Sequence, residues 1–193
     1  MRIFVFGLGS IGSNLLVQLA NMLRDFSFIG IDHDIVEEKN IGIQAYFLEH
    51  IDLLKTQAMH SVLYRFSRSV KYEYQTMKIS SEQDLQSFQF SNDDIIIDCF
   101  DNIESRKLIK GLFHENVLHI GFSHHYTAEI IWDSDYIANG NIESDIIDIC
   151  GMHDATAFIS LIVSLSSIML YDFILNKVKS NYVVTQKLHI KKL

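Results

Sequence analysis

A glycine-rich turn near the N-terminus constrains this chain more than any other feature. An apolar run at residues 3–6 leads into Gly-Leu-Gly-Ser-Ile-Gly at residues 7–12, which has the spacing G-x-G-x-x-G. Leucines at helical spacing follow, and a second apolar run at residues 28–31 ends at Asp32, twenty positions after the last glycine. This order of strand, turn, helix, strand and acid is a βαβ nucleotide fingerprint, in which the acid accepts hydrogen bonds from ribose hydroxyls.

Each residue of the turn has a distinct expected role. Gly7 permits the tight turn, Gly9 lets the main chain approach a diphosphate, and Gly12 lets the helix pack closely on the strand. Ser10 and Ile11 open the helix, whose N-terminus offers unpaired N–H groups and a positive dipole end to phosphates. A turn that serves only folding is the alternative interpretation.

Composition narrows the class of protein. A chain of 193 residues fits one domain, so we expect a single unit over residues 1–193. The formal charge of −8 argues against a nucleic-acid partner, because phosphate neutralisation needs clustered lysines and arginines. The two cysteines, Cys99 and Cys150, cannot form a disulfide framework, and no signal peptide precedes the first strand. We therefore expect a cytoplasmic protein.

One segment resembles a membrane span by composition. Residues 155–171 carry no charge, but the segment is shorter than the ~20 apolar residues that a span needs and contains several serines. We expect a buried core helix or a dimer-interface helix there, and no membrane partner.

The remaining pattern predicts an α/β fold. Strands are expected at residues 3–6, 28–31, 70–79, 94–98 and 117–122, with helices between them, including one from about residue 50. Such alternation is typical of a Rossmann-like, mostly parallel sheet with helices on both faces. Residues 127–133 read as an additional, antiparallel strand, followed by a long helix ending near residue 177 and an edge strand at residues 182–190. Ligands bind beyond the carboxyl ends of parallel strands, where Asp101 and Asn102 lie.

With these residues placed, the chain resembles the ThiF/MoeB/HesA superfamily, the adenylating enzymes related to ubiquitin-activating enzymes. The resemblance covers roughly residues 3–174 and is strongest up to about residue 109. It rests on the glycine motif, on the acid pair Asp32 and Asp34, on Lys55, and on Asp101-Asn102 with Arg106 four residues later. The resemblance implies MgATP as the cofactor and adenylation of a carboxylate, usually the C-terminal glycine of a ubiquitin-like or sulfur-carrier protein.

The resemblance also implies the site. The nucleotide would contact Gly7, Gly9, Ser10, Ile11, Gly12, Asp32, Asp34, Asn40, Gln44, Lys55 and Asn102. When the carboxylate attacks the α-phosphate, charge builds on phosphate oxygens, and Lys55 with a magnesium ion on Asp101 would stabilise it. The plainer alternatives are a helix cap at Asp101-Asn102 and a solvated lysine at position 55.

Thiol and metal candidates are weaker. Cys150 lies near the position where some relatives carry a cysteine that attaches to the activated carrier, and a loop or core cysteine is the alternative. His124, His125, Cys150 and His153 could gather around zinc, although no recognised spacing supports this. Cys99 is expected to be a core residue.

Departures from the family pattern keep other functions open. Ile43 stands where the family usually has an arginine, and the spacing from Gln44 to Lys55 is one residue short. The family also carries an arginine upstream of the first strand, which a partner would have to supply here. A second hypothesis is therefore a non-catalytic, degenerate nucleotide-binding or scaffold subunit, and a third is an NAD-dependent oxidoreductase. The resemblance implies a homodimer and a small carrier protein as partners.

Overall fold

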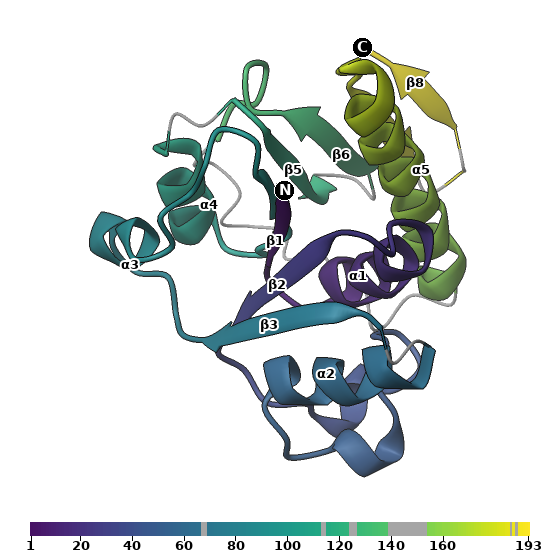
Figure 1. Ribbon diagram of the computed structural model, residues 1–193. Helices are drawn as coiled ribbons and strands as arrows, with labels where there is room; N and C mark the ends of the chain where they lie inside the picture. Colours follow the sequence, from purple (N-terminus) through teal and green to yellow (C-terminus); the bar gives the residue numbers. More distant parts are fainter. Residues whose placement is uncertain (67–68, 113–114, 124–126, 139–153, 186, 188) are drawn as a thin grey trace.

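The computed structural model describes residues 1–193 except 67–68, 113–114, 124–126, 139–153, 186 and 188. Its strands form an eight-stranded sheet in the order β3-β2-β1-β4-β5-β6-β7-β8 (Figure 1). The parallel strands are β1 (Arg2–Phe6), β2 (Ser27–Asp32), β3 (Lys71–Thr76), β4 (Ile95–Asp98) and β5 (Val117–Ser123). The antiparallel strands are β6 (Thr127–Trp132), β7 (Tyr182–Thr185) and β8 (Ile190–Lys192). The predicted fold class is confirmed.

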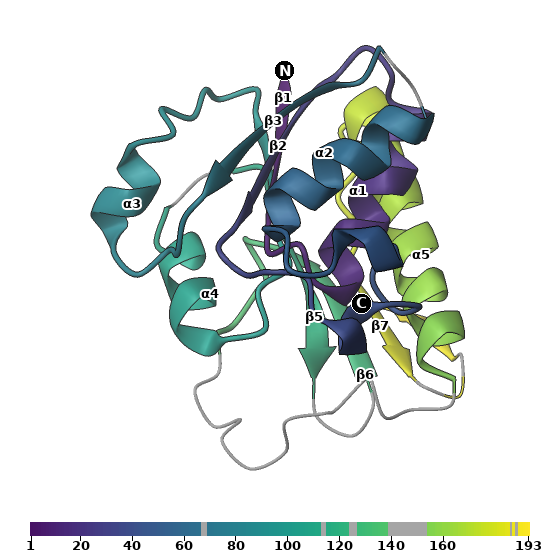
Figure 2. The ribbon, with the colours of Figure 1, turned by 90° about the horizontal axis from the view of Figure 1, so that it is seen from below.

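Helices cover both faces of this sheet (Figure 2). One face carries α1 (Ser10–Met22), α2 (Lys55–Phe66) and α5 (Ala155–Asn176). The other carries the shorter α3 (Glu82–Gln86) and α4 (Ile103–Lys110). Two 3-10 turns, Glu38–Asn40 and Leu48–His50, lie in the segment between β2 and α2.

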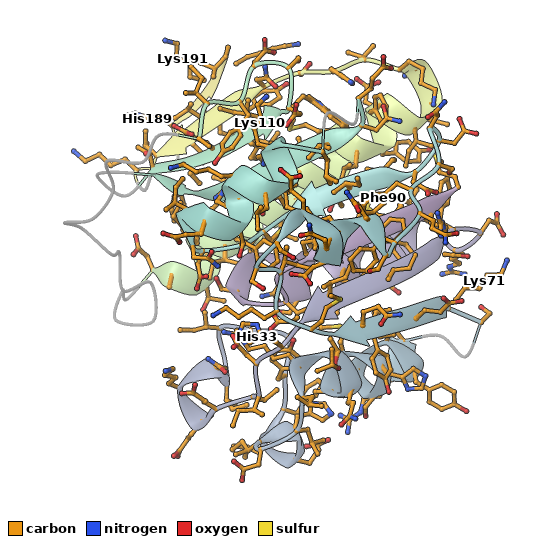
Figure 3. The ribbon with its side chains drawn as sticks, turned by 90° about the vertical axis from the view of Figure 1, so that its left-hand side faces the viewer. His33, Lys71, Phe90, Lys110, His189 and Lys191 are labelled. Atoms are coloured by element: carbon orange, nitrogen blue, oxygen red, sulfur yellow. The ribbon has the colours of Figure 1, made fainter. Side chains whose placement is uncertain are left out.

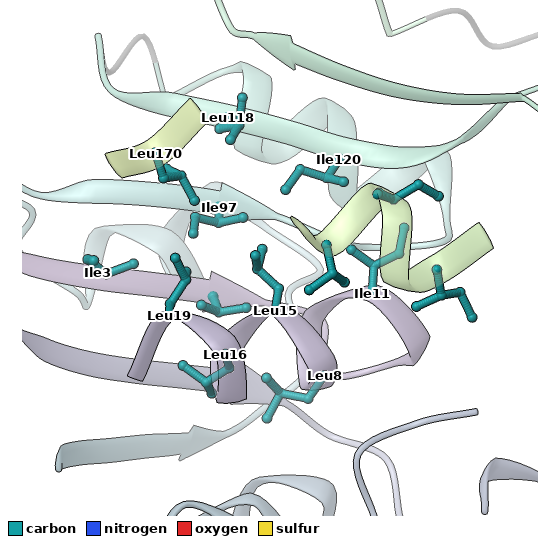
Figure 4. Close-up of a cluster of buried hydrophobic side chains, with 14 of the residues drawn as sticks. Ile3, Leu8, Ile11, Leu15, Leu16, Leu19, Ile97, Leu118, Ile120 and Leu170 are labelled. Carbon is teal, nitrogen blue, oxygen red and sulfur yellow. The ribbon is translucent and has the colours of Figure 1, made fainter. Parts of the chain in front are cut away.

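The central strand β1 shows why the sheet is buried on both sides. Side chains alternate along a strand, so Ile3 and Val5 join the core under α1 and α5, while Phe4 and Phe6 join the core on the α4 face. Figure 4 shows the first of these cores, with leucines of α1 packed over strand residues such as Ile97. A strand buried on both faces reads as a continuous apolar run, as this one does.

Helix α5 is long and apolar enough to cross a membrane by length and composition alone. Its most apolar 18-residue window has a mean hydropathy of 2.0, and half of that window is buried inside the protein. The helix packs along α1, and Phe158 and Phe173 lie in the core. This packing agrees with the core helix predicted for the segment.

Three element boundaries differ from prediction. Helix α2 begins at Lys55 rather than near residue 50, because a 3-10 turn occupies Leu48–His50. The single strand predicted at residues 182–190 is a hairpin of two short strands, with Val184 paired to Ile190. Strand β3 is shorter than predicted and largely exposed, because it lies at the edge of the sheet.

Acid sensitivity is expected at the amino-terminal end of the sheet, where Arg2 meets the buried Asp94. Burial raises the pKa of Asp94, but hydrogen bonds from the Arg2 guanidinium and from the main-chain N–H groups of Ser91 and Arg2 outweigh it and lower that pKa to about 2. A carboxyl group stabilises the fold when its pKa is lower in the folded than in the unfolded protein. This stabilisation is complete above the unfolded-state pKa and is lost as the pH falls through the folded-state pKa.

We therefore expect about 2 kcal/mol of folding free energy to disappear between about pH 4 and pH 2 on account of Asp94. Urea unfolding of the wild type and of Asp94→Asn at a series of pH values measures this contribution. The two proteins should converge in stability as the pH falls. A constant difference between them across this range would contradict the assignment.

Candidate functional site

The site predicted from the sequence lies where the connections between strands switch from one face of the sheet to the other. Strand β1 pairs with β2 on one side and with β4 on the other. The connection after β1 runs through α1 on one face, whereas the connection into β4 runs through α3 on the opposite face. Ligand sites of open α/β sheets form at such switch points, beyond the carboxyl ends of the strands.

The three glycines of the first turn meet three different surroundings. Gly7 has φ +84°, and a Cβ there would lie 2.8 Å from the Cys99 carbonyl oxygen. A Cβ on Gly12 would lie 1.9 Å from the Gly7 carbonyl oxygen, so both positions require glycine. A Cβ on Gly9 would meet nothing within 4 Å. The open space beside Gly9 is where a diphosphate could approach the main chain.

The N-terminus of α1 is available to an anion. Its N-cap, Gly9, supplies no side-chain hydrogen bond, and the first turn contains no acidic residue. The first N–H groups of a helix have no partner within the helix and carry the positive end of its dipole. The side chain of Ile11 is buried in the core, so its contribution to a ligand is limited to its main-chain N–H.

Two side chains that are distant in the sequence fix the glycine turn through hydrogen bonds to the main-chain N–H and carbonyl oxygen of Leu8. The Leu8 N–H donates to Asp32 Oδ2 over 2.6 Å, and the Tyr46 hydroxyl donates to the Leu8 carbonyl oxygen over 2.8 Å. Asp32 Oδ1 accepts the Asp34 N–H over 2.8 Å. Asp32 is therefore a buried anchor of the turn, a role that the sequence analysis missed along with that of Tyr46.

Lys55 brings a cation to the end of β2. Its side chain is 9% exposed, and its Nζ lies 2.9 Å from Asp34 Oδ2, so it is not the solvated lysine of the plainer interpretation. Burial raises the pKa of Asp34, yet the hydrogen bond and the charge of Lys55 lower it below its ordinary value. Because Asp34 is half exposed, this pair remains open to a ligand from the solvent side.

The segment after β2 carries two further predicted residues. Asn40 is buried, and its Oδ1 accepts the Glu37 N–H over 2.9 Å, so it shapes a local turn. The Gln44 Oε1 is buried and has no hydrogen-bond partner among the residues that the structure describes. A buried acceptor without a hydrogen bond costs ~1–3 kcal/mol of folding free energy, and a hydrogen-bond donor on a bound ligand would offset this cost. Gln44 also lines a mostly apolar cavity of about 600 Å³.

The end of β4 carries the predicted metal ligand. Asp101 is exposed just beyond the strand, and Asn102 caps α4 by accepting the Ser105 N–H over 2.8 Å. The helix-cap interpretation therefore holds for Asn102. The oxygen of an exposed carboxylate suits magnesium, which keeps several waters.

A second set of potential cation ligands consists of Asp32, His33 and Asp34, whose ligand atoms lie within 4.8 Å of one another. Figure 3 labels His33 at the end of β2. Asp32 already accepts two N–H groups and Asp34 already pairs with Lys55, so these carboxylates are engaged within the protein.

Of the thiol and zinc candidates, only Cys99 lies within the described residues. Cys150, His124, His125 and His153 lie outside the described residues. Cys99 packs against the core as predicted, and burial together with the neighbouring Asp98 raises the pKa of its thiol. A thiol with a raised pKa is a poor nucleophile, which agrees with a structural role.

A family comparison decides the relationship of this chain to known proteins. The model of the ThiF family matches residues 1–125, which include the glycine turn, Lys55 and Asp101-Asn102. The chain belongs to the ThiF family. The expected relationship is thereby confirmed.

Solved structures share the fold of this ThiF-family chain. E. coli MccB with MccA superposes with a TM-score of 0.77 at 16% identity, covering 100% of this chain and 62% of that one. PaaA gives a TM-score of 0.71 at 15% identity, covering 100% of this chain and 72% of that one. E. coli MccB with AMPCPP and MccA gives 0.74 at 16% identity, with 63% of that chain covered. No curated protein matches by sequence.

Proposed function

We propose that this chain binds MgATP at the first turn and adenylates a carboxylate. Membership of the ThiF family supports an adenylyltransferase-like activity of this kind. The chain spans 62% of the length of the E. coli MccB chain, so the activity of the whole relative is part of the proposal.

A continuous line of hydrogen bonds from Lys55 to the glycine turn carries the proposal. Lys55 Nζ donates to the Asp34 carboxylate, the Asp34 N–H donates to the Asp32 carboxylate, and Asp32 accepts the Leu8 N–H. A buried cation is thus tied to the turn whose Gly9 leaves open space for phosphates. A nicotinamide site would need the same turn but would not need this cation.

The residues have distinct tasks in the proposed reaction. The main-chain N–H groups at Ser10 and Ile11 bind phosphate oxygens at the start of α1. Lys55 stabilises the charge that builds as the carboxylate attacks the α-phosphate and pyrophosphate leaves. Magnesium held by Asp101 would neutralise further phosphate charge when bound. Asp34, whose carboxylate is half exposed, would accept hydrogen bonds from the ribose, while the buried Asp32 holds the turn.

The solved complexes of E. coli MccB support a proposal about the class of substrate. E. coli MccB has been solved with MccA, and also with MccA and AMPCPP together. We propose that this chain acts on the carboxylate of a small protein or peptide, and a small carboxylic acid is the alternative.

The test is ATP–pyrophosphate exchange with purified protein, magnesium and candidate carboxylates. Exchange that depends on both the carboxylate and the metal supports the enzyme. Measurable ATP binding without exchange on any substrate would favour the non-catalytic subunit. That second candidate gains support from Ile43, which packs against the core where the family usually has an arginine. Calorimetric titration with ATP and with NAD separates both from an oxidoreductase.

We also propose that a second copy of the chain covers the outer face of α5. Ile168 and Leu175 are 61% and 60% exposed, and Tyr171 is 44% exposed on the same face. Exposed apolar side chains gathered on one helix face mark an interaction surface. Light scattering should give a dimer for the wild type and a smaller species for Ile168→Asp. A strict monomer at micromolar concentration would contradict the dimer.

A further inference from the structure

A buried polar network that the sequence analysis did not include lies on the α4 face of the sheet. Its centre is His119 on β5, which is fully buried. His119 Nδ1 lies 2.7 Å from Asp98 Oδ2, and His119 Nε2 lies 2.9 Å from Asp133 Oδ1. Both ring nitrogens therefore lie within hydrogen-bond distance of a carboxylate oxygen.

Cations from α4 complete the network. Lys110 Nζ lies 3.0 Å from Asp133 Oδ2, and Arg106 Nε lies 3.3 Å from Asp98 Oδ2. The Tyr136 ring stacks on the His119 ring with centroids 3.8 Å apart, and it also faces the Arg106 guanidinium. Lys110, labelled in Figure 3, is the more exposed of the two cations, with a side chain that is 33% exposed. The charges compensate one another, which a buried carboxylate requires.

The network ends on the main chain just before the predicted metal ligand. The Phe100 N–H donates to Asp98 Oδ1 over 3.0 Å, and Arg106 Nη1 donates to the Phe100 carbonyl oxygen over 3.3 Å. Both polar groups of the Phe100 main chain are therefore fixed by side chains of the network. Gly121 leaves the space for Arg106, because a Cβ there would lie 1.9 Å from Arg106 Nη1.

We propose that His119 is a positioning residue that holds Asp98, and through Asp98 the Phe100 peptide and Asp101, in the place that the metal ion requires. The importance of Asp101 rests on the proposed function, whereas the clamp on Phe100 is a property of the folded chain alone. His119 does not touch the reacting atoms in this assignment. His119 fixes the rotamer of Asp98 and thereby the main chain that leads to Asp101. A bound magnesium ion would then meet a preorganised Asp101 carboxylate.

Two amide variants of His119 separate this role from a merely structural one. The side-chain nitrogen of asparagine comes close to the place of Nδ1, so His119→Asn keeps a donor toward Asp98. The nitrogen of glutamine comes close to the place of Nε2, so His119→Gln keeps a donor toward Asp133 only. Both variants are polar and remove the ring, so their loss of packing is similar. His60→Asn, at an exposed histidine of α2, is the control for the substitution.

The main readout is amide hydrogen exchange by NMR without nucleotide. We expect the Phe100 amide to exchange about tenfold faster in His119→Gln than in the wild type, with His119→Asn close to the wild type. The magnesium concentration that half-saturates pyrophosphate exchange should rise in His119→Gln alone. Equal Phe100 exchange in the two variants, or no change in either, would overturn the assignment.

Wild-type protein gives a result even if both variants fail to fold. The Cys99 amide donates to the Phe6 carbonyl oxygen in the sheet, and the Phe100 amide should be protected to a similar degree. A Phe100 amide that exchanges about as fast as one in a solvated loop would overturn the clamp. Protection of Phe100 in a protein without exchange activity would instead count against the proposed function and leave the clamp in place.

Discussion

Replacing Gly12 by alanine is expected to lower the free energy of unfolding by about 3 kcal/mol or more. The new Cβ would lie 1.9 Å from the Gly7 carbonyl oxygen and 3.3 Å from the Cys99 Cβ. Alanine favours a helix over glycine by only ~1 kcal/mol, so the steric conflict with the main chain decides the sign. Urea unfolding followed by circular dichroism measures the change.

Gly9→Ala is the matched control, since a Cβ there would meet nothing within 4 Å. The free energy of unfolding of this variant should fall by no more than about 1 kcal/mol, because the only expected cost is that alanine is a poorer N-cap residue than glycine. Its affinity for ATP should fall, because the methyl group occupies the space assigned to phosphates. Full stability of Gly12→Ala, or unchanged ATP binding by Gly9→Ala, would contradict this picture of the turn.

Replacing Lys55 by methionine is expected to slow pyrophosphate exchange by about 10²–10³-fold. Methionine keeps the buried stem of the side chain and removes the charge that lies 2.9 Å from Asp34 Oδ2. Asp34 is half exposed and can be solvated, so the free energy of unfolding should change by less than about 1 kcal/mol. The assay compares exchange rates at saturating ATP, with stability measured in parallel.

Lys39→Met is the control for the loss of a lysine from the same region. Lys39 is exposed and pairs with Glu37 over 2.7 Å, so its removal should leave exchange near the wild-type rate. Equal effects at the two lysines would point to a loss of overall charge. Exchange that survives in Lys55→Met would remove Lys55 from the proposed mechanism.

Local patterns explain what could be predicted from the sequence. The glycine turn constrains its own geometry through the positive φ of Gly7 and the close approach at Gly12, both of which depend on residues a few positions apart. The apolar run before Asp98 and the alternation of strands with helices likewise indicated the parallel sheet. Family spacing then pointed to Lys55, which the fold indeed brings to the end of β2 beside Asp34.

The contacts that position the site were out of reach, because they join distant residues. Asp32 was assigned to ribose, and its hydrogen bond to Leu8 spans 24 residues. His119 lies 21 residues from Asp98 and 14 from Asp133, and these pairs become neighbours only through the register of β4, β5 and β6. A lone histidine within an apolar strand was the available signal, and its partners could not be named without the strand order.

The place of β1 in the sheet has a consequence for how the chain is made. Of the eight strands in this sheet, β1 is the first to be synthesised although it lies in the interior of the sheet, and its second neighbour, β4, lies at Ile95–Asp98. Nascent chains shorter than this leave one side of β1 without a partner, with its apolar edge open to other chains. Synthesis therefore passes through a vulnerable interval of about 90 residues before the sheet can close around its centre.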